Sequence, residues 1–232
     1  MISIIIPTLN EENALPQTLS RITEQQSLSS IDHEIIIVDG GSTDSTADIV
    51  RSFQAKQKYV HFTQSERGRA LQLNTGAQLA TGDILLFLHA DTLLPKDGIV
   101  QIFDSATTCS SFAGCFRHKF SGYYWGLKIV SLLHNWRFKI TRIVYGDQAM
   151  FISRDLFLEL GGFPNQLAED VFFCKKLITV CKPIMLNANV TTDSRKFEQI
   201  GVWRALWQVI TIQRNSRKSD AVAHPEFFHD FR

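Results

Sequence analysis

The sequence predicts an α/β fold in which a mainly parallel β-sheet is flanked by helices on both faces. Short runs of β-branched and aliphatic residues alternate along the chain with stretches of helical periodicity, and the loops between them are short. Several runs are apolar on both sides, as in strands buried in the middle of a parallel sheet. A chain of 232 residues without linker, repeat or low-complexity segment is expected to form a single domain.

The first half of the chain carries the clearest pattern. Four apolar runs are expected to pair in parallel, because a helical stretch follows each of the first three and can serve as the crossover. Ser42 or Thr43 is expected to cap the second helix. The expected strands are 2–6, 34–38, 59–63 and 84–88, and the expected helices are 14–26, 43–55 and 69–80.

The second half is less regular. An aromatic-rich stretch, 123–138, has apolar residues at helical spacing, and Gly161-Gly162-Phe163-Pro164 breaks a helix sharply. The first expectation for 123–138 and for a last amphipathic helix is packing against the flank of the sheet. The alternatives are an acceptor groove and a membrane interface. The expected strands are 112–116, 149–152 and 184–186, and the expected helices are 98–106, 154–160, 171–180 and 199–213.

The fourth apolar run is followed directly by polar side chains that could bind a ligand. Ile84 to Leu88 is followed at once by His89-Ala90-Asp91. If the chain stays extended, His89 and Asp91 point to the same side and Ala90 to the other. A carboxylate just beyond the carboxyl end of a central strand lies where open α/β sheets bind ligands. The alternative is that Asp91 only begins a turn.

Carboxylates also follow the first and second runs. Glu11, Asp39 and Asp91 each lie in the loop after a predicted parallel strand. The carboxyl ends of parallel strands share one edge of the sheet, so these side chains are expected at a common rim. A rim of this kind suits a ligand that offers hydroxyls, ring N–H groups or a cation.

Composition and missing motifs exclude other classes of function. A net charge of +1 argues against a general nucleic-acid binder, which is usually strongly basic. The chain has neither a P-loop nor a Gly-x-Gly-x-x-Gly pattern, which argues against an ATPase or an NAD enzyme. The four cysteines lack metal-site spacing, and the N-terminus lacks the basic region of a signal peptide. No window approaches the ~18 apolar residues of a membrane span, so a cytoplasmic location is expected.

Five motifs together resemble the family 2 glycosyltransferases of GT-A fold. Each is weak alone, but their order is specific, and the similarity runs from about Ile2 to Leu177. The motifs are Pro7-Thr8-Leu9-Asn10-Glu11-Glu12, Val38-Asp39-Gly40-Gly41-Ser42-Thr43-Asp44, His89-Ala90-Asp91, Gly161-Gly162-Phe163 and Glu169-Asp170. The resemblance implies an inverting transferase that uses a nucleotide-diphosphate sugar, with a UDP sugar as the expected donor, and a divalent metal.

The same resemblance assigns roles to particular positions. Pro7, Glu11 and Asp39 would hold the base and ribose of the donor. Asp91 would be the second carboxylate of an Asp-x-Asp motif, binding metal and diphosphate, and Asp170 would be the catalytic base. The resemblance places Arg195 against the diphosphate, and Arg69 is a further candidate for donor binding. At the start of its helix, Asp170 is expected to be stabilised as the anion by the helix dipole.

One position departs from the family pattern, because His89 stands where the first aspartate of Asp-x-Asp is expected. Mg²⁺ prefers oxygen ligands and imidazole suits softer metals, so either Mn²⁺ or Mg²⁺ remains open as the cofactor, with His89 and Asp91 as its ligands. His89 could equally contact ribose or phosphate. Four other histidines, His118, His134, His224 and His229, are expected to be surface or core residues.

The resemblance also implies a division of the chain. We expect one glycosyltransferase domain over 1–214, with a donor-binding half of about 1–95, an acceptor half of about 96–214 and a tail of 215–232. The acceptor is unknown and could be lipid-linked, which would place the protein at the inner face of the membrane. Two alternatives stay open: a non-catalytic nucleotide-sugar binder and a sugar-phosphate nucleotidyltransferase.

Overall fold

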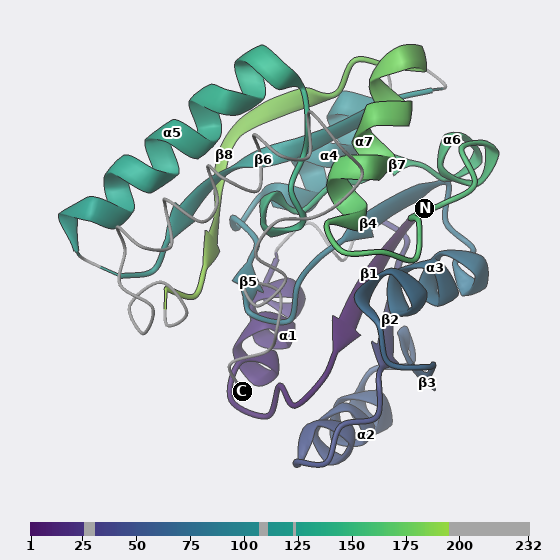
Figure 1. Ribbon diagram of the computed structural model, residues 1–232. Helices are drawn as coiled ribbons and strands as arrows, with labels where there is room; N and C mark the ends of the chain where they lie inside the picture. Colours follow the sequence, from purple (N-terminus) through teal and green to yellow (C-terminus); the bar gives the residue numbers. More distant parts are fainter. Residues whose placement is uncertain (26–30, 107–110, 123, 195–232) are drawn as a thin grey trace.

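The computed structural model describes residues 1–25, 31–106, 111–122 and 124–194. These residues form one α/β domain around an eight-stranded sheet with the order β3-β2-β1-β4-β7-β6-β8-β5 (Figure 1). The α/β fold expected from the sequence is confirmed. The helix expected at 199–213, the tail and Arg195 lie outside the described residues.

The first four strands form a continuous parallel part of the sheet. Strands β3, β2, β1 and β4 pair in parallel, with Thr8 opposite Asp39 and Ile5 opposite Phe87. β1 and β4 are fully buried, which explains why both are apolar on both sides. The elements are β1 (Ile2–Thr8), α1 (Leu15–Thr23), β2 (His33–Asp39), α2 (Thr46–Lys56), β3 (Val60–Gln64), α3 (Arg69–Leu79) and β4 (Ile84–Phe87).

The rest of the sheet mixes directions. β7 is antiparallel to both β4 and β6, β6 and β8 are parallel, and β5 pairs antiparallel with β8. The short strand β5 and the 3-10 helix η2 are additional to the sequence prediction, and β8 extends well beyond 184–186. The elements are β5 (Thr92–Leu93), α4 (Gly98–Ala106), β6 (Ala113–Phe120), α5 (Trp125–Thr141), η2 (Gly146–Gln148), β7 (Phe151–Ser153), α6 (Arg154–Glu159), α7 (Glu169–Val180) and β8 (Ile184–Thr192).

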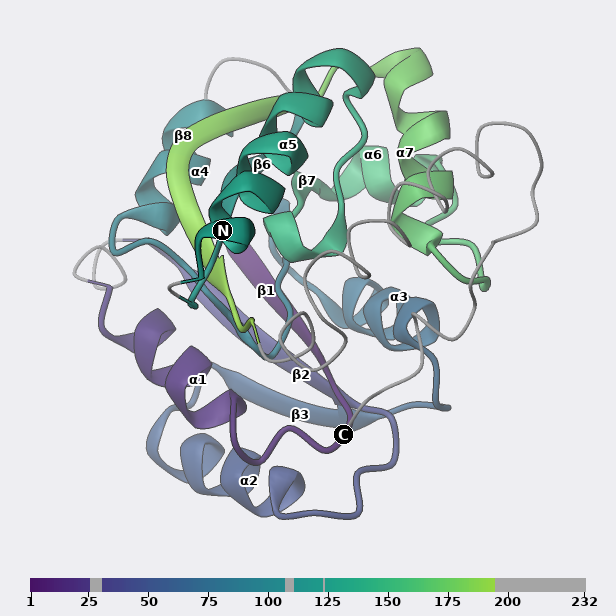
Figure 2. The same cartoon turned by 60° about the vertical axis from the view of Figure 1, so that its left-hand side comes forward.

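Two hydrophobic layers cover the two faces of the sheet. One contains apolar side chains of α1, α2 and α4, and the other contains those of α3, α6 and α7. Figure 2 shows α1 and α2 on one side of the sheet and α3, α6 and α7 on the other. The aromatic rings of Phe87, Phe157, Phe163 and Phe173 lie in the second layer at centroid distances of 4.9–5.2 Å. This layer ties α7 to the end of β4, and α7 begins with Glu169 and Asp170.

Two local predictions are wrong. Neither Ser42 nor Thr43 caps the second helix, since α2 begins at Thr46 and Ser45 precedes it. Ser42 instead donates its backbone N–H and its hydroxyl to Asp39. The fourth strand ends at Phe87, and His89 to Thr92 form a turn in which Thr92 N donates to His89 O at 3.1 Å. The extended alternation assumed for His89 and Asp91 therefore does not apply.

The prediction that 123–138 packs as core is wrong for its aromatic stripe. Helix α5 buries Leu127, Val130 and Phe138, and its opposite face is exposed. Among the described residues no helix is both long and apolar enough to cross a membrane. The exposed apolar side chains of this helix are Trp125, Ile129, Leu132, Leu133, Trp136 and Ile140.

Candidate active site

The site lies at the carboxyl ends of β1, β2 and β4. Helix α3 joins the ends of β1 and β2, because Gln72 Nε2 donates to Thr8 O at 2.7 Å and to Val38 O at 2.9 Å. Arg69 begins α3 less than one turn earlier. The first turn of α3 therefore lies beside the loops that carry Glu11 and Asp39, as parallel α/β topology requires.

Asp39 is fully buried, and its carboxylate accepts hydrogen bonds mainly from its own loop. Oδ2 accepts the backbone N–H groups of Gly41 and Ser42 at 3.1 and 2.9 Å, and Oδ1 accepts the hydroxyls of Ser42 and Thr8. A carboxylate held by several donors fixes the shape of its loop. Asp39 thus has a structural role that the sequence prediction did not include.

The other two residues expected on the donor side also hold the loop. Pro7 is buried in β1 and pairs with Val38. Glu11 is 5% exposed, and its backbone connects two helices: its N–H donates to Thr46 Oγ1 at 2.7 Å, and its C=O accepts from Leu15 N at 2.9 Å. The backbone that follows β1 is therefore rigid, which is a requirement for a preorganised binding loop.

A hydrogen bond from α1 holds the His89–Asp91 turn in place. Thr18 Oγ1 donates to Ala90 O at 2.6 Å, and Ala90 is 2% exposed. The His89 ring packs on Gly146, where an added Cβ would lie 2.5 Å from Nε2. Burial, and next the positive charge of Arg69, lower the pKa of His89. A neutral imidazole and a carboxylate on one turn fit a divalent ion, with Mn²⁺ more tolerant of the nitrogen than Mg²⁺.

Arg69 forms a partly buried ion pair with Glu169, which comes from the other half of the chain. Arg69 Nε donates to Glu169 Oε1, and the Glu169 side chain is 6% exposed. Burial acts in the opposite direction, but Glu169 and Asp170 together raise the pKa of Arg69. The guanidinium is therefore a permanent positive charge at the centre of the site.

Asp170 lies next to this pair. Its Oδ2 accepts Gly146 N–H at 2.8 Å and its Oδ1 accepts Val171 N–H at 2.7 Å. Burial and the neighbouring Glu169 raise the pKa of Asp170 to about 6, although Arg69 acts in the opposite direction. The expectation that the helix dipole dominates is corrected, since burial and a like charge outweigh it. The carboxylate is still mostly ionised at neutral pH.

The Gly161-Gly162-Phe163 motif positions α7. Both glycines have positive φ, 82° and 70°, a conformation that costs glycine little. Asn74 of α3 then holds Phe163 by two hydrogen bonds, donating to Phe163 O at 2.8 Å and accepting from Phe163 N at 2.9 Å. Ala168, with φ 58°, turns the chain directly into Glu169 and Asp170. The motif fixes where the two acids lie relative to Arg69.

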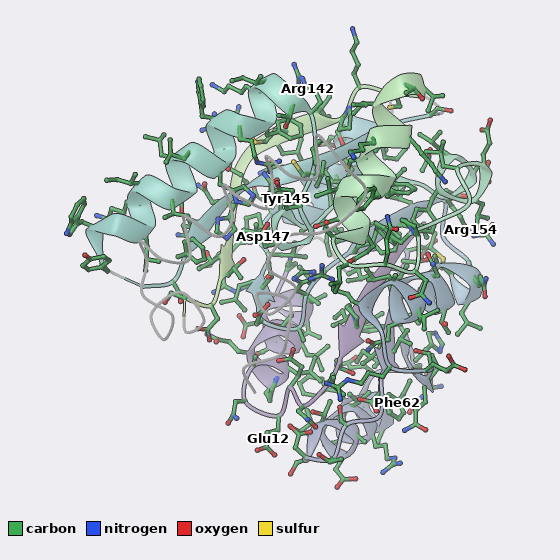
Figure 3. The ribbon with its side chains drawn as sticks, in the orientation of Figure 1. Glu12, Phe62, Arg142, Tyr145, Asp147 and Arg154 are labelled. Atoms are coloured by element: carbon green, nitrogen blue, oxygen red, sulfur yellow. The ribbon has the colours of Figure 1, made fainter. Side chains whose placement is uncertain are left out.

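A second polar group borders the site. His118 on β6 is buried, His134 on α5 has a side chain that is 10% exposed, and both rings face Asp147 of η2. Burial alone would raise the pKa of Asp147, but the two histidines lower it. Figure 3 shows Asp147 and Tyr145 below α5, near the middle of the molecule.

The structure brings together most of the candidates from the sequence. Arg69, Asp91, Asp147 and Glu169 all act electrostatically on His89, and Asp170 contacts Arg69 in the same way. From the sequence, no separate role was assigned to Glu169 or Asp147. The Gly-Asp-Gln sequence before a buried strand could have drawn attention to Asp147, but nothing local predicts the pairing of Glu169 with Arg69.

Comparison with known proteins now decides the family. The family model for glycosyl transferase family 2 matches residues 3–158. The chain belongs to this family. A PGL/p-HBAD biosynthesis glycosyltransferase of Mycobacterium bovis is 34% identical over 173 residues, 70% of this chain and 63% of that protein. The chain thus spans about 63% of the length of this relative.

Solved structures support the fold of this family 2 chain. A mannosyltransferase of Pyrobaculum calidifontis, in complex with GDP-Man and Mn²⁺, has a TM-score of 0.72 at 24% identity, covering 98% of this chain and 66% of its own. TarS 1–349 of S. aureus, in complex with UDP-GlcNAc, has a TM-score of 0.67 at 22% identity, covering 84% and 58%. At these identities the similarity establishes the GT-A fold alone.

Proposed function

We propose that this family 2 chain is an inverting, metal-assisted glycosyltransferase that moves a sugar from a nucleotide-diphosphate sugar to a hydroxyl acceptor. The observation that carries the proposal is the position of Asp170. Its carboxylate is buried, held by two backbone N–H groups and adjacent to the Arg69–Glu169 pair at the carboxyl edge of the sheet. Family membership supplies the class of reaction.

In this proposal Asp170 is the general base. Each of its oxygens accepts one backbone hydrogen bond and keeps a further lone pair for the proton of the acceptor hydroxyl. The hydroxyl oxygen forms the new bond to the sugar carbon while the bond from that carbon to the diphosphate oxygen breaks. A carboxylate with a pKa of about 6 is a stronger base than an exposed aspartate and is still ionised at pH 7.

The donor would occupy the edge between the loop after β1 and the His89–Asp91 turn. Pro7, Glu11 and Asp39 would line the nucleoside side. His89 and Asp91 would hold a divalent ion, Mn²⁺ or Mg²⁺, whose chemistry is to neutralise charge on the leaving diphosphate. Arg69 supplies a fixed positive charge near the same place, and Arg195 is proposed to contribute a further one.

The identity of the nucleotide is tested by its effect on stability. A ligand that binds only the folded state raises the melting temperature by mass action. We expect a UDP sugar with Mn²⁺ to raise it most, because UDP-GlcNAc is bound in the TarS structure; the mannosyltransferase structure, which holds GDP-Man, makes GDP sugars the main competitor. A panel of UDP, GDP and dTDP sugars with and without metal measures this directly.

The substitution Asp170→Asn tests the catalytic role. It keeps the shape of the side chain and removes the basic lone pair, so we expect transfer to fall by about 10²–10⁴-fold while donor binding is retained. Donor binding by the wild type without any transfer would support a non-catalytic nucleotide-sugar binder. Pyrophosphate release from a nucleoside triphosphate would support a nucleotidyltransferase. Either result would contradict the proposal.

For the acceptor side we propose contact with an anionic membrane surface, from which a lipid-linked acceptor could enter. The exposed apolar face of α5 includes Leu132 at 69%, Ile140 at 62% and Trp136 at 59% exposure. Lys128 and Lys139 of the same helix are exposed, and its sequence contains no acidic residue. A helix with tryptophans on one side and lysines beside them is typical of an interfacial segment.

Flotation with anionic vesicles tests this contact. We expect the wild type to float with the vesicles and the double variant Leu132→Ser/Trp136→Ser to bind at least about tenfold more weakly, because two apolar side chains no longer enter the interface. Leu79→Ser is the matched control, since Leu79 is 53% exposed on α3. No flotation of the wild type, or equal loss in the control, would exclude the membrane contact.

A further inference from the structure

A cluster of two histidines and one aspartate lies between β6, α5 and η2, and the proposed transfer reaction does not use it. His118 comes from β6, His134 from α5 and Asp147 from η2, so three separate elements converge on it. None of the three residues belongs to the His89–Asp91 turn. Within the described residues this is the one group of three histidine, cysteine or acidic side chains arranged closely enough to share a metal ion.

The polar atoms of the cluster are buried and lack hydrogen bonds. His118 is 1% exposed, and neither of its ring nitrogens has a hydrogen-bond partner. The same holds for His134 Nε2 and Asp147 Oδ1. Each buried polar atom without a partner costs about 1–3 kcal/mol, so this concentration in one place requires an explanation.

The distances between these atoms fit ligands of a common ion. His134 Nε2 lies 3.4 Å from Asp147 Oδ1, and His118 Nε2 lies 3.7 Å from Asp147 Oδ2. Two atoms that bind one tetrahedral zinc ion at about 2.1 Å are roughly 3.4 Å apart. The two rings are stacked with centroids 5.0 Å apart, which turns both Nε2 atoms toward the aspartate.

The neighbouring cation does not occupy the cluster. Arg137 acts electrostatically on His134, but its guanidinium is engaged elsewhere. Its Nη1 donates to Ile143 O at 3.0 Å, its Nη2 donates to Gln148 Oε1 at 3.2 Å, and the group lies over the ring of Tyr145.

From these contacts we infer that His118, His134 and Asp147 form a binding site for a divalent transition metal of the zinc class. Two imidazoles and one carboxylate suit Zn²⁺ or Co²⁺, whereas Mg²⁺ and Ca²⁺ prefer sites made of oxygen atoms. The site shares no ligand with the neighbouring His89–Asp91 pair, and metal binding there does not depend on glycosyl transfer. Bound metal joins β6, α5 and η2 and thereby fixes the wall of the site next to Gly146.

The test is metal binding by the full chain without nucleotide. After chelator treatment, Co²⁺ titration followed by visible absorption is expected to show one saturable site that Zn²⁺ displaces and Mg²⁺ does not. His134→Gln and Asp147→Asn should each weaken binding at least about tenfold, the effect that loss of even an outer-shell partner produces. His61→Gln, which alters an exposed carboxylate-paired histidine, and Asp91→Asn should leave it unchanged.

Zinc-edge X-ray absorption of the loaded wild type needs no variant and is expected to show two imidazole nitrogens among light-atom ligands. Absence of saturable binding, a spectrum with no imidazole, or unchanged affinity in both folded variants would overturn the assignment. Loss of binding in Asp91→Asn alone would overturn it as well, since the metal would then belong to the donor side. Failure of glycosyl transfer has no bearing on these measurements.

Discussion

The two halves of the molecule use their buried carboxylates in opposite ways. In the first half, residues 1–95, Asp39 accepts four hydrogen bonds from residues that are near in sequence or on the paired strand. In the second half Asp170 is buried beside charges from distant elements, and Asp147 has one buried oxygen without a hydrogen-bond partner. A carboxylate bonded by its own loop holds that loop in shape, whereas one that lies beside distant charges or has an unpartnered oxygen remains available to bind a proton or a metal.

The largest expected effect is a loss of stability when Asp39 is replaced. Asp39→Ala leaves two buried N–H groups and two hydroxyls without their acceptor, so the free energy of unfolding should fall by about 4 kcal/mol. Chemical denaturation measures this. Asp48→Ala is the control, because Asp48 is an exposed partner of Arg51 and should change stability by less than about 0.5 kcal/mol. Equal losses in the two variants would remove the contrast between the halves.

Asp170→Asn is expected to raise the free energy of unfolding at pH 7, whereas Asp39→Ala is expected to lower it. The pKa of Asp170 is raised from 3.8 to about 6 on folding, so its contribution to stability is complete below pH 3.8 and is lost as the pH rises through 6. The variant avoids this loss and should be more stable than the wild type at pH 7 by at most about 3 kcal/mol. The difference should vanish near pH 4.

Melting temperatures between pH 4 and pH 8 measure this effect. Asp155→Asn serves as the control, since Asp155 occupies the first turn of α6 but is exposed. In the wild type the transfer rate should also rise with pH around an apparent pKa of about 6 and then level off. A destabilised Asp170→Asn variant at pH 7 would show that its carboxylate stabilises the fold, as that of Asp39 does.

A smaller effect is expected at the boundary between the halves. Gly146→Ala places a Cβ 2.5 Å from His89 Nε2, and the buried ring has to move. We expect a loss of about 2 kcal/mol in stability, typical of overpacking. In a His89→Ala background the same substitution should cost almost nothing, because the obstructing ring is gone. Additive losses in the double variant would show that the two residues do not contact each other.

The sequence predicted the elements that depend on local pattern. Apolar runs and helical periodicity located the strands and helices of the donor-binding half to within a few residues. The carboxylates after three of these strands indicated one edge of the sheet. One prediction was wrong because the side chain had two possible hydrogen-bond partners. Ser42 was expected to cap a helix, but it donates hydrogen bonds to Asp39 instead. Periodicity does not show which face of α5 is covered, since both faces are apolar.

By itself, the sequence determined the α/β class and the family and indicated candidate residues of the site, because repeated apolar patterns and ordered motifs are properties of neighbouring positions. Only the tertiary structure decided the chemical state of those residues. The pairing of Arg69 with Glu169, the raised pKa of Asp170 and the convergence of His118 and His134 on Asp147 join segments far apart in the chain. Burial and electrostatic interaction depend on distance in space, and the fold alone sets that distance.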